Sequence, residues 1–197
     1  MKSENQGAKP KGIVGKTIGV LMNRYHTRLY KRYFCNNLPE YSSRILDVGC
    51  GGGKFIQFLS VQDQSYVLYG LDHSAEMIAL TRKINKTAIS QNRLHLIQDS
   101  IMNMVMPDNS FDLITALETV QFWDNTYECF SKIYRLLRPG GKFTIINRYP
   151  AVGSNWWKSA KLKNDKEYIS ALKQSGFGVV AASFSLKKGW ITVEAVK

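Results

Sequence analysis

Two patterns of hydrophobic residues alternate along the chain. Short, mostly apolar runs predict strands, and segments with apolar residues three or four positions apart predict helices. The predicted strands span residues 44–48, 66–71, 93–97, 111–117, 142–147, 177–186 and 190–196. The predicted helices span residues 17–38, 75–88, 124–138 and 164–175, and another begins at residue 54. Strands that alternate with helices predict a parallel sheet with helices on both faces.

The predicted fold class is therefore α/β, with a doubly wound, mostly parallel seven-stranded sheet. The last two strands flank Lys187-Lys-Gly189, which predicts a hairpin and hence one antiparallel strand. Ser74 is predicted to cap the helix over 75–88. The sequence Arg138-Pro-Gly-Gly141 is predicted to end the helix over 124–138, because glycine readily adopts the left-handed conformation of a helix stop.

Length and composition indicate one globular domain with an extension. The chain has 197 residues, of which 44% are hydrophobic and 21% charged. This balance excludes disordered, collagen-like and disulfide-framework proteins. We expect a flexible basic tail over residues 1–16, an N-terminal helical lid segment over 17–40 and the main domain over 41–197.

The net charge of +12 is concentrated near the N-terminus, where residues 1–44 hold nine basic and two acidic residues. This excess fits either a solvated tail with an exposed helix face or electrostatic capture of a polyanion such as RNA. The RNA interpretation lacks a zinc-finger, homeodomain or RNA-recognition signature.

The cysteines and the apolar runs bear on location and partners. Cys35, Cys50 and Cys129 are scattered and form no Cys-x-x-Cys pair, so neither a metal site nor a disulfide framework is expected. Reduced thiols are typical of a cytoplasmic protein. No apolar run approaches the ~18 residues of a membrane span, so we expect no membrane partner.

The first predicted strand leads into a glycine-rich turn, Asp47-Val-Gly49-Cys-Gly-Gly-Gly53. Such glycines allow a sharp turn and let a ligand lie against bare backbone at the start of the following helix. The dinucleotide fingerprint G-x-G-x-x-G needs glycine where Lys54 stands, and Asp47 would repel a pyrophosphate. Both features disfavour a nicotinamide-dependent oxidoreductase and favour a ligand that carries a positive charge.

Two more acids follow the next strands. Asp72 ends the second strand, 19 residues after Gly53, at a distance typical of carboxylates that bind ribose hydroxyls. Asp99 ends the third strand. The carboxyl ends of parallel strands form the rim where open α/β sheets bind ligands, so we expect these acids to surround one ligand.

An ordered series of motifs resembles the class I S-adenosylmethionine-dependent methyltransferases, in their small stand-alone bacterial form. The matching segments are Ile45-Leu-Asp-Val-Gly-Cys-Gly-Gly-Gly53, Tyr69-Gly-Leu-Asp-His-Ser-Ala-Glu-Met77, Gln98-Asp-Ser100, Pro107-Asp-Asn-Ser-Phe-Asp-Leu-Ile114 and Tyr134-Arg-Leu-Leu-Arg-Pro-Gly-Gly-Lys-Phe143. The resemblance covers residues 44–147 and, more loosely, the chain up to 196. It implies the Rossmann-like methyltransferase fold over the main domain and S-adenosyl-L-methionine as cofactor.

The resemblance also implies roles for the glycine-rich turn. Asp47 and Gly49 would lie by the methionyl amino group, and Gly51 and Gly53 by the sugar and the sulfonium. Cys50 stands where the family often has a hydroxyl residue, which puts one side-chain hydrogen bond in doubt but not the turn.

The later motifs contribute the rest of the implied cofactor site. Asp72 would bind both ribose hydroxyls, and His73 would cover the cofactor. Met77 would pack near the adenine, although a methionine on an amphipathic helix is more often core. Asp99 would bond the adenine amino group, with Ser100 beside it.

The resemblance places the fourth strand at the methyl-transfer end. Leu117 would line the cofactor, and Glu118 would lie at the mouth through which the methyl group passes. If the acceptor must lose a proton, the candidate bases are Glu118, His26, Tyr149 and Asp124. His26 has the alternative of an ordinary helix-face histidine, and Asp124 that of a helix cap.

Methyl transfer to a small-molecule acceptor is the predicted function. The sequence after the fourth strand, Leu117-Glu-Thr-Val-Gln121, lacks the Asn-Pro-Pro-Tyr type of motif common in enzymes that methylate base amino groups. An RNA-modifying methyltransferase that uses the basic N-terminal segment, and a non-catalytic cofactor-binding protein, are the alternatives.

Overall fold

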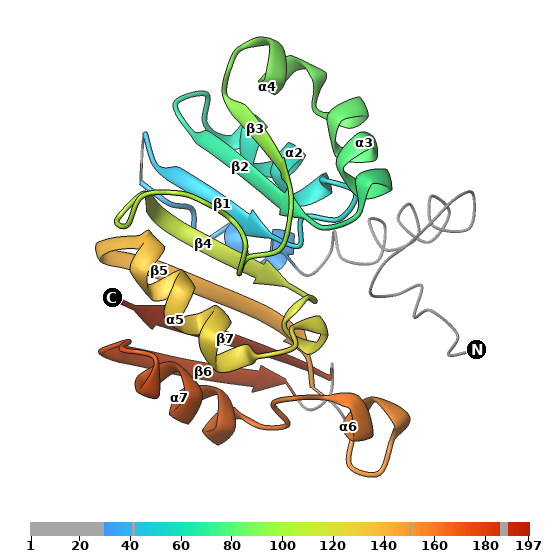
Figure 1. Ribbon diagram of the computed structural model, residues 1–197, viewed down its shortest axis with the longest axis vertical. Helices are drawn as coiled ribbons and strands as arrows, with labels where there is room; N and C mark the ends of the chain where they lie inside the picture. The colour runs from blue at the N-terminus through green and yellow to red at the C-terminus, as the bar shows by residue number, and fades with distance from the viewer. Residues whose placement is uncertain (1–29, 41, 150, 186–188) are drawn as a thin grey trace. The chain divides into compact units, whose positions relative to one another are not determined.

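The computed structural model describes residues 30–40, 42–149, 151–185 and 189–197 (Figure 1). The described chain forms a seven-stranded sheet with helices, which confirms the predicted fold class. Most predicted strands agree with the observed ones within two residues at each end. The chain divides into two compact units, Met1–Met104 and Val105–Lys197, which are described in turn.

The first unit has three parallel strands in the order β3-β2-β1. They are β1 (Arg44–Val48), β2 (Val67–Asp72) and β3 (Leu94–Gln98), and the helices are α2 (Lys54–Gln62), α3 (Ala75–Ile84) and α4 (Lys86–Ser90). Helix α2 packs closely on β2, since a Cβ atom on Gly70 would lie 2.6 Å from Cδ1 of Ile56. A bare glycine in the middle strand therefore lets the helix approach the sheet.

A short helical segment over residues 30–34 precedes this sheet. Tyr30 and Phe34 are buried, and both rings contact Phe55 of α2 at centroid distances of 5.1 and 4.8 Å. The predicted helix over 17–38 is too long at its C-terminal end, because the side-chain amide of Asn37 donates to the backbone oxygen of Tyr33 and closes the last turn. The rest of that prediction, residues 17–29, lies outside the described residues.

The predicted helix over 75–88 is in fact two helices, which meet at Asn85. The buried side-chain amide of Asn85 donates to the backbone oxygens of Thr81, at 2.9 Å, and of Gly53, at 3.1 Å. These bonds end α3 and tie it to the start of α2. Ser74 caps α3 as predicted, since its hydroxyl accepts from the backbone N–H of Met77.

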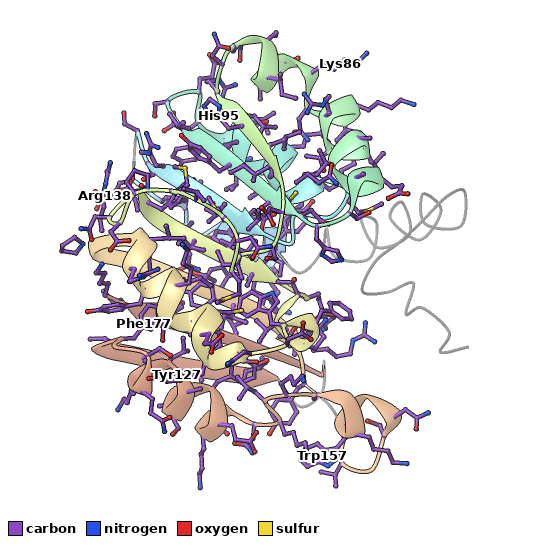
Figure 2. The ribbon with its side chains drawn as sticks, viewed as in Figure 1. Lys86, His95, Tyr127, Arg138, Trp157 and Phe177 are labelled. Carbon is purple, nitrogen blue, oxygen red and sulfur yellow. The ribbon has the colours of Figure 1, made fainter. Side chains whose placement is uncertain are left out.

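The second unit has four strands in the order β4-β5-β7-β6. They are β4 (Phe111–Leu117), β5 (Leu137–Arg148), β6 (Val179–Ser185) and β7 (Trp190–Val196), with β7 antiparallel to both neighbours as predicted. The helical elements are the 3-10 turn η1 (Val120–Phe122), α5 (Thr126–Leu136), α6 (Asn155–Ser159) and α7 (Asp165–Gln174). The ring of Phe177, which is labelled in Figure 2, contacts the rings of Tyr134 and Phe143 at centroid distances of 5.3 and 6.1 Å.

The helix predicted over 124–138 is two residues too long at each end, and its predicted cap and stop are wrong. Asn125, not Asp124, caps α5, because its side-chain oxygen accepts from the N–H of Glu128. The helix ends at Leu136, and the residues predicted to stop it are already extended strand. Gly140 has a positive φ of 76°, but it serves strand pairing, since its N–H donates to the backbone oxygen of Lys197.

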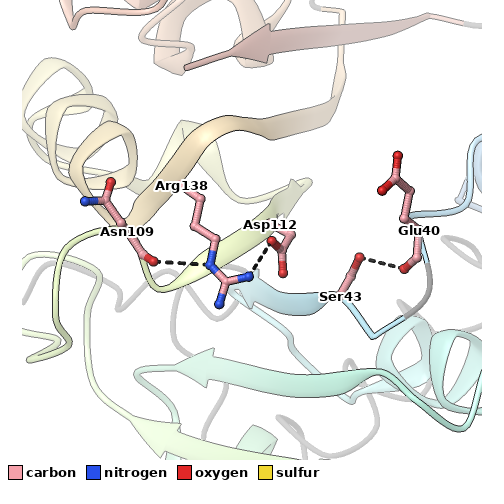
Figure 3. Close-up of polar contacts among 5 residues, drawn as sticks. All are labelled: Glu40, Ser43, Asn109, Asp112 and Arg138. Atoms are coloured by element: carbon pink, nitrogen blue, oxygen red, sulfur yellow. Dashed lines mark hydrogen bonds and ion pairs between the residues drawn. The ribbon is translucent and has the colours of Figure 1, made fainter.

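The same stretch also makes a surface ion pair. Arg138 contacts the carboxylate of Asp112 at 2.8 Å and donates from Nε to the backbone oxygen of Asn109 (Figure 3). Both charged side chains are substantially exposed, so water screens the pair. Within the described part of the chain, no helix has the length and hydropathy to cross a membrane.

Candidate functional site

The glycine-rich turn after β1 is held in a conformation that favours glycine. Gly49, Gly51 and Gly53 have φ values of 74°, 51° and 70°. The N–H groups of Gly49 and Cys50 both donate to the backbone oxygen of Leu71, at 2.7 and 3.0 Å. The turn is therefore fixed against the carboxyl end of β2, as expected for a ligand-binding turn on this rim.

Two glycines of the turn have opposite surroundings. A Cβ atom on Gly53 would lie 2.4 Å from Cγ2 of Thr81, so only glycine fits against α3. A Cβ atom on Gly51 would meet only the backbone oxygen of Gly49, at 4.0 Å, so the space above Gly51 is open. Thr81 also donates its hydroxyl to the backbone oxygen of Gly51 at 2.7 Å. The turn is thus packed against α3 at Gly53 and open at Gly51, which leaves room for a ligand beside the backbone of Gly51.

Asp72 joins the turn to the start of α3. One carboxylate oxygen accepts from the N–H of Gly51 at 2.8 Å, and the other accepts from the N–H of Ser74 at 2.9 Å. Burial raises the pKa of this carboxyl, although both bonds oppose the rise. Each oxygen keeps a second lone pair, so the arrangement is compatible with the predicted bonds to ribose hydroxyls. Those bonds stay a prediction.

Cys50 lies near both Asp47 and Asp72. Asp47 is only 3% exposed, and both acids raise the pKa of the Cys50 thiol, after the larger effect of burial. Cys50 is therefore a neutral thiol at physiological pH. Two buried carboxyl groups beside an open turn suit a ligand that carries positive charge.

The remaining predicted cofactor residues have different surroundings. Asp99 lies next to Asp72, because its N–H donates to the backbone oxygen of Asp72 at 3.1 Å, and its carboxylate accepts from the N–H of Ser100. His73 and Ser100 are exposed. Met77 is 3% exposed and belongs to the core in this structure. Their roles toward a cofactor stay predictions.

Glu118 follows β4 in the second unit. It is a non-glycine residue with a left-handed φ of 58°, a strained conformation that is enriched at functional sites. Its N–H donates to the backbone oxygen of Ile146 at 2.8 Å. Burial raises the pKa of its carboxyl to about 7, against the opposing influence of Arg148, whose Nε lies 3.6 Å away. Leu117, immediately before it, is half-buried.

Sequence reasoning missed two polar residues around Glu118. The side-chain amide of Asn147, at the end of β5, donates to the hydroxyl of Tyr168 on α7 at 2.9 Å. Tyr168 also senses the charge of Glu118, which contributes to the raised pKa of its hydroxyl after the larger effect of burial. Asn147 ends a strand, as Asp72 and Asp99 do, and that shared position was a signal available in the sequence.

The other two proposed bases differ in what the structure describes. Tyr149 is half-buried, and its backbone N–H donates to the oxygen of Gly189 at 2.8 Å. His26 lies outside the described residues. No cluster of three or more histidine, cysteine or acidic side chains suited to a metal ion occurs among the residues that the structure describes.

Comparisons with known proteins bear on this site. A family model for a methyltransferase domain matches residues 46–145. Cycloartenol-C-24-methyltransferase of Arabidopsis thaliana is 28% identical over 152 residues, which are 70% of this chain and 45% of that protein. Fatty-acid O-methyltransferase of Mycolicibacterium smegmatis is 27% identical over 139 residues, which are 71% and 49%. The chain thus spans about half the length of these two relatives.

A shorter relative and a solved structure match over more of their length. The uncharacterized methyltransferase YdaC of Bacillus subtilis is 26% identical over 149 residues, 76% of this chain and 79% of that protein. A chain in the complex between the Haloferax volcanii Trm112 methyltransferase activator and a methyltransferase superposes with a TM-score of 0.80. It is 19% identical and covers 91% of this chain and 93% of that one, which shows a shared fold.

Proposed function

Because the chain belongs to the methyltransferase-domain family, we propose that it transfers a methyl group from S-adenosylmethionine to a small-molecule acceptor. The match confirms the family recognised in the sequence, and S-adenosylmethionine is the cofactor of that family, as predicted. When bound, this cofactor supplies a methyl group activated by a positively charged sulfur.

The observation that carries the proposal is the way Asp72 holds the glycine-rich turn. Its carboxylate fixes Gly51 through one oxygen and the start of α3 through the other. The turn, the acid and the helix terminus are thereby pre-arranged around the open space above Gly51. Such pre-organisation reduces the entropy lost when a ligand binds.

Charge explains why this turn suits the proposed cofactor better than a dinucleotide. Asp47 and Asp72 are both buried beside the turn, and a buried carboxylate favours a nearby cation. A pyrophosphate at the same place would be repelled by both. A methionyl ammonium or a sulfonium would be stabilised instead.

Glu118 supports a role in proton handling. A carboxyl group with a pKa of about 7 accepts a proton readily from an acceptor at neutral pH, whereas an ordinary glutamate is too weak a base. The proposed catalytic roles of His26 and Tyr149 rest on the sequence alone.

The class of acceptor is supported by the relatives. The printed names of two of them refer to a sterol and a fatty acid, which are small molecules. RNA is the alternative acceptor, and the basic N-terminal segment motivates it. Salt-sensitive RNA binding that disappears on deletion of residues 1–40 would favour RNA over a small molecule.

Two measurements test the proposed function. Isothermal titration calorimetry with S-adenosylhomocysteine should show binding that Asp72→Asn weakens at least tenfold, because the amide replaces a buried anion with a neutral group. Asp108→Asn, the same change at an exposed acid, is the matched control. Circular dichroism checks that both variants are folded.

Turnover is measured with S-adenosylmethionine labelled in its methyl group and a mixed acceptor library. Label in a small-molecule product supports the proposal. Cofactor binding without any labelled product would instead support a non-catalytic cofactor-binding protein. Absence of S-adenosylhomocysteine binding by folded protein would refute both.

A further inference from the structure

Two buried oxygens of the second unit need hydrogen-bond donors. Oε1 of Glu118 and Oδ1 of Asn147 have no donor among the described residues, although the two side chains are only 7% and 3% exposed. A buried polar atom without a partner costs free energy, so each such atom in a native protein calls for an explanation, such as a catalytic role or a bound group.

The two residues lie at neighbouring strand ends. Leu117 of β4 and Ile146 of β5 are partners in the parallel register, and each is followed directly by one of them. The N–H of Glu118 also donates to the backbone oxygen of Ile146. Glu118 and Asn147 are therefore adjacent on the rim where open α/β sheets bind their ligands.

Two further side chains complete a group of four, which we call the rim cluster: Glu118, Gln121, Asn147 and Tyr168. Tyr168 accepts from the amide of Asn147, which fixes the orientation of that amide. Gln121 donates to the backbone oxygen of Glu118 at 2.6 Å, and its own Oε1 has no donor within the described part of the chain.

Arg148 does not meet this need. Arg148 lies 3.6 Å from the other oxygen of Glu118, Oε2, and its side chain is 45% exposed. It leaves Oε1 without a donor, and water screens its charge. The rim cluster thus holds three acceptor oxygens, on three different side chains, that have no donor among the described residues.

The number of acceptors distinguishes between ligand groups. A carboxylate would bring only further acceptors against these oxygens, and an alcohol or phenol brings a single O–H. An ammonium group brings up to three N–H donors. Of these three groups, only the ammonium carries enough donors for more than one of these oxygens.

We propose that the rim cluster binds the acceptor of the methyl transfer and that the acceptor group is an amine. This inference rests on the proposed methyltransferase function and specifies its substrate class. Asn147 and Gln121 orient the N–H groups, and Tyr168 is a positioning residue that acts through Asn147.

The transfer balances with Glu118 as proton acceptor. A bound ammonium gives one proton to the Glu118 carboxylate and becomes a neutral amine. The nitrogen lone pair forms a C–N bond to the methyl group while the C–S bond breaks and its electron pair stays on sulfur. The product is a methylated ammonium, and Glu118 passes its proton to water.

The rate should depend on pH through Glu118. The charged and titratable groups around it are Arg148 of β5 and Tyr168 of α7, with Glu167 acting on Tyr168. Because Glu118 must be ionised to take the proton, methyl transfer should rise as the pH increases through about 7. A purely structural Glu118 would produce no such profile.

The test uses the full chain, methyl-labelled S-adenosylmethionine and the small-molecule fraction of a bacterial extract. Mass spectrometry locates the label in each product. We expect label on nitrogen. Label on oxygen or carbon alone would overturn the inference while leaving the proposed function intact. No labelled product despite S-adenosylhomocysteine binding would remove the transferase function, and this inference would fall with it.

Variants then test the rim cluster itself. Glu118→Gln should lower the rate of N-methyl formation about a hundredfold at pH 7 and abolish the pH profile. Its affinity for S-adenosylhomocysteine should stay within about twofold, since the side-chain contact given for Glu118 is with Arg148. Glu128→Gln, the same change on an exposed part of α5, should leave the rate unchanged. A wild-type rate and pH profile in Glu118→Gln would overturn the inference.

Discussion

Replacing Gly53 with alanine should destabilise the protein far more than the same change at Gly51. Both glycines have a positive φ, so both alanines carry the strain of a left-handed backbone. Only at position 53 does the new methyl group also collide with a neighbour, since its Cβ would lie 2.4 Å from Cγ2 of Thr81.

The two costs can be worked out separately. The left-handed conformation costs a non-glycine residue about 1–2 kcal/mol. Forcing an extra carbon into a packed region costs about 1–3 kcal/mol more. We therefore expect Gly53→Ala to lower the free energy of unfolding by about 3 kcal/mol and Gly51→Ala by about 1–2 kcal/mol.

Urea denaturation followed by circular dichroism measures both values. Thr81→Ser removes Cγ2, the nearest of three colliding atoms, but keeps Oγ1 and Cβ, which would still lie 2.6 and 2.8 Å from the new Cβ. It should therefore relieve only part of the cost of Gly53→Ala. Equal destabilisation by the two alanine variants would refute the close packing inferred for the turn.

Three further predictions follow from individual contacts. The pKa of Glu118 is about 7 in the folded protein, against an ordinary value of 4.5. The protonated carboxyl therefore stabilises the folded state fully below pH 4.5, and this contribution to the free energy of unfolding is lost as the pH rises through 7. Urea titrations of the wild type should therefore show the free energy of unfolding fall by up to about 3 kcal/mol between pH 4.5 and 7, and Glu118→Gln should lack this fall. The same pH dependence in both proteins would contradict this. Thr81→Val leaves the partly buried backbone oxygen of Gly51 without its hydroxyl donor and should lower the free energy of unfolding in urea by about 1–2 kcal/mol. An unchanged free energy of unfolding would count against the bond. Arg138→Gln breaks an exposed ion pair with Asp112 and should change the melting midpoint little, by an equivalent of under about 1 kcal/mol; a larger loss would show that water does not screen the pair.

Local patterns predicted the strands well because each strand is a short apolar run whose signal lies within its own residues. Helix ends were harder to predict. The helix over 75–88 breaks at Asn85 because that side chain bonds Gly53, which is 32 residues away. The helix before Arg138 stops early because Gly140 pairs with Lys197, at the far end of the chain. No local window contains either partner.

The sequence likewise predicted part of the candidate site, namely the residues but not their contacts. The positions of Asp72 and Asp99 at strand ends could be deduced from spacing alone. The bond from Gly51 to Asp72 depends on how β1 and β2 pair, so the sequence showed the acid without its partner. The place of Asn147 at the end of a predicted strand could have been noticed, but its bond to Tyr168 arises only when α7 packs near the end of β5.

A crystal structure with S-adenosylhomocysteine tests the central claim most directly. We expect the ligand along the turn from Gly49 to Gly53, with the ribose hydroxyls bonded to the carboxylate of Asp72 and the adenine near Asp99. An adenosine bound elsewhere, or a ribose that makes no contact with Asp72, would contradict the account.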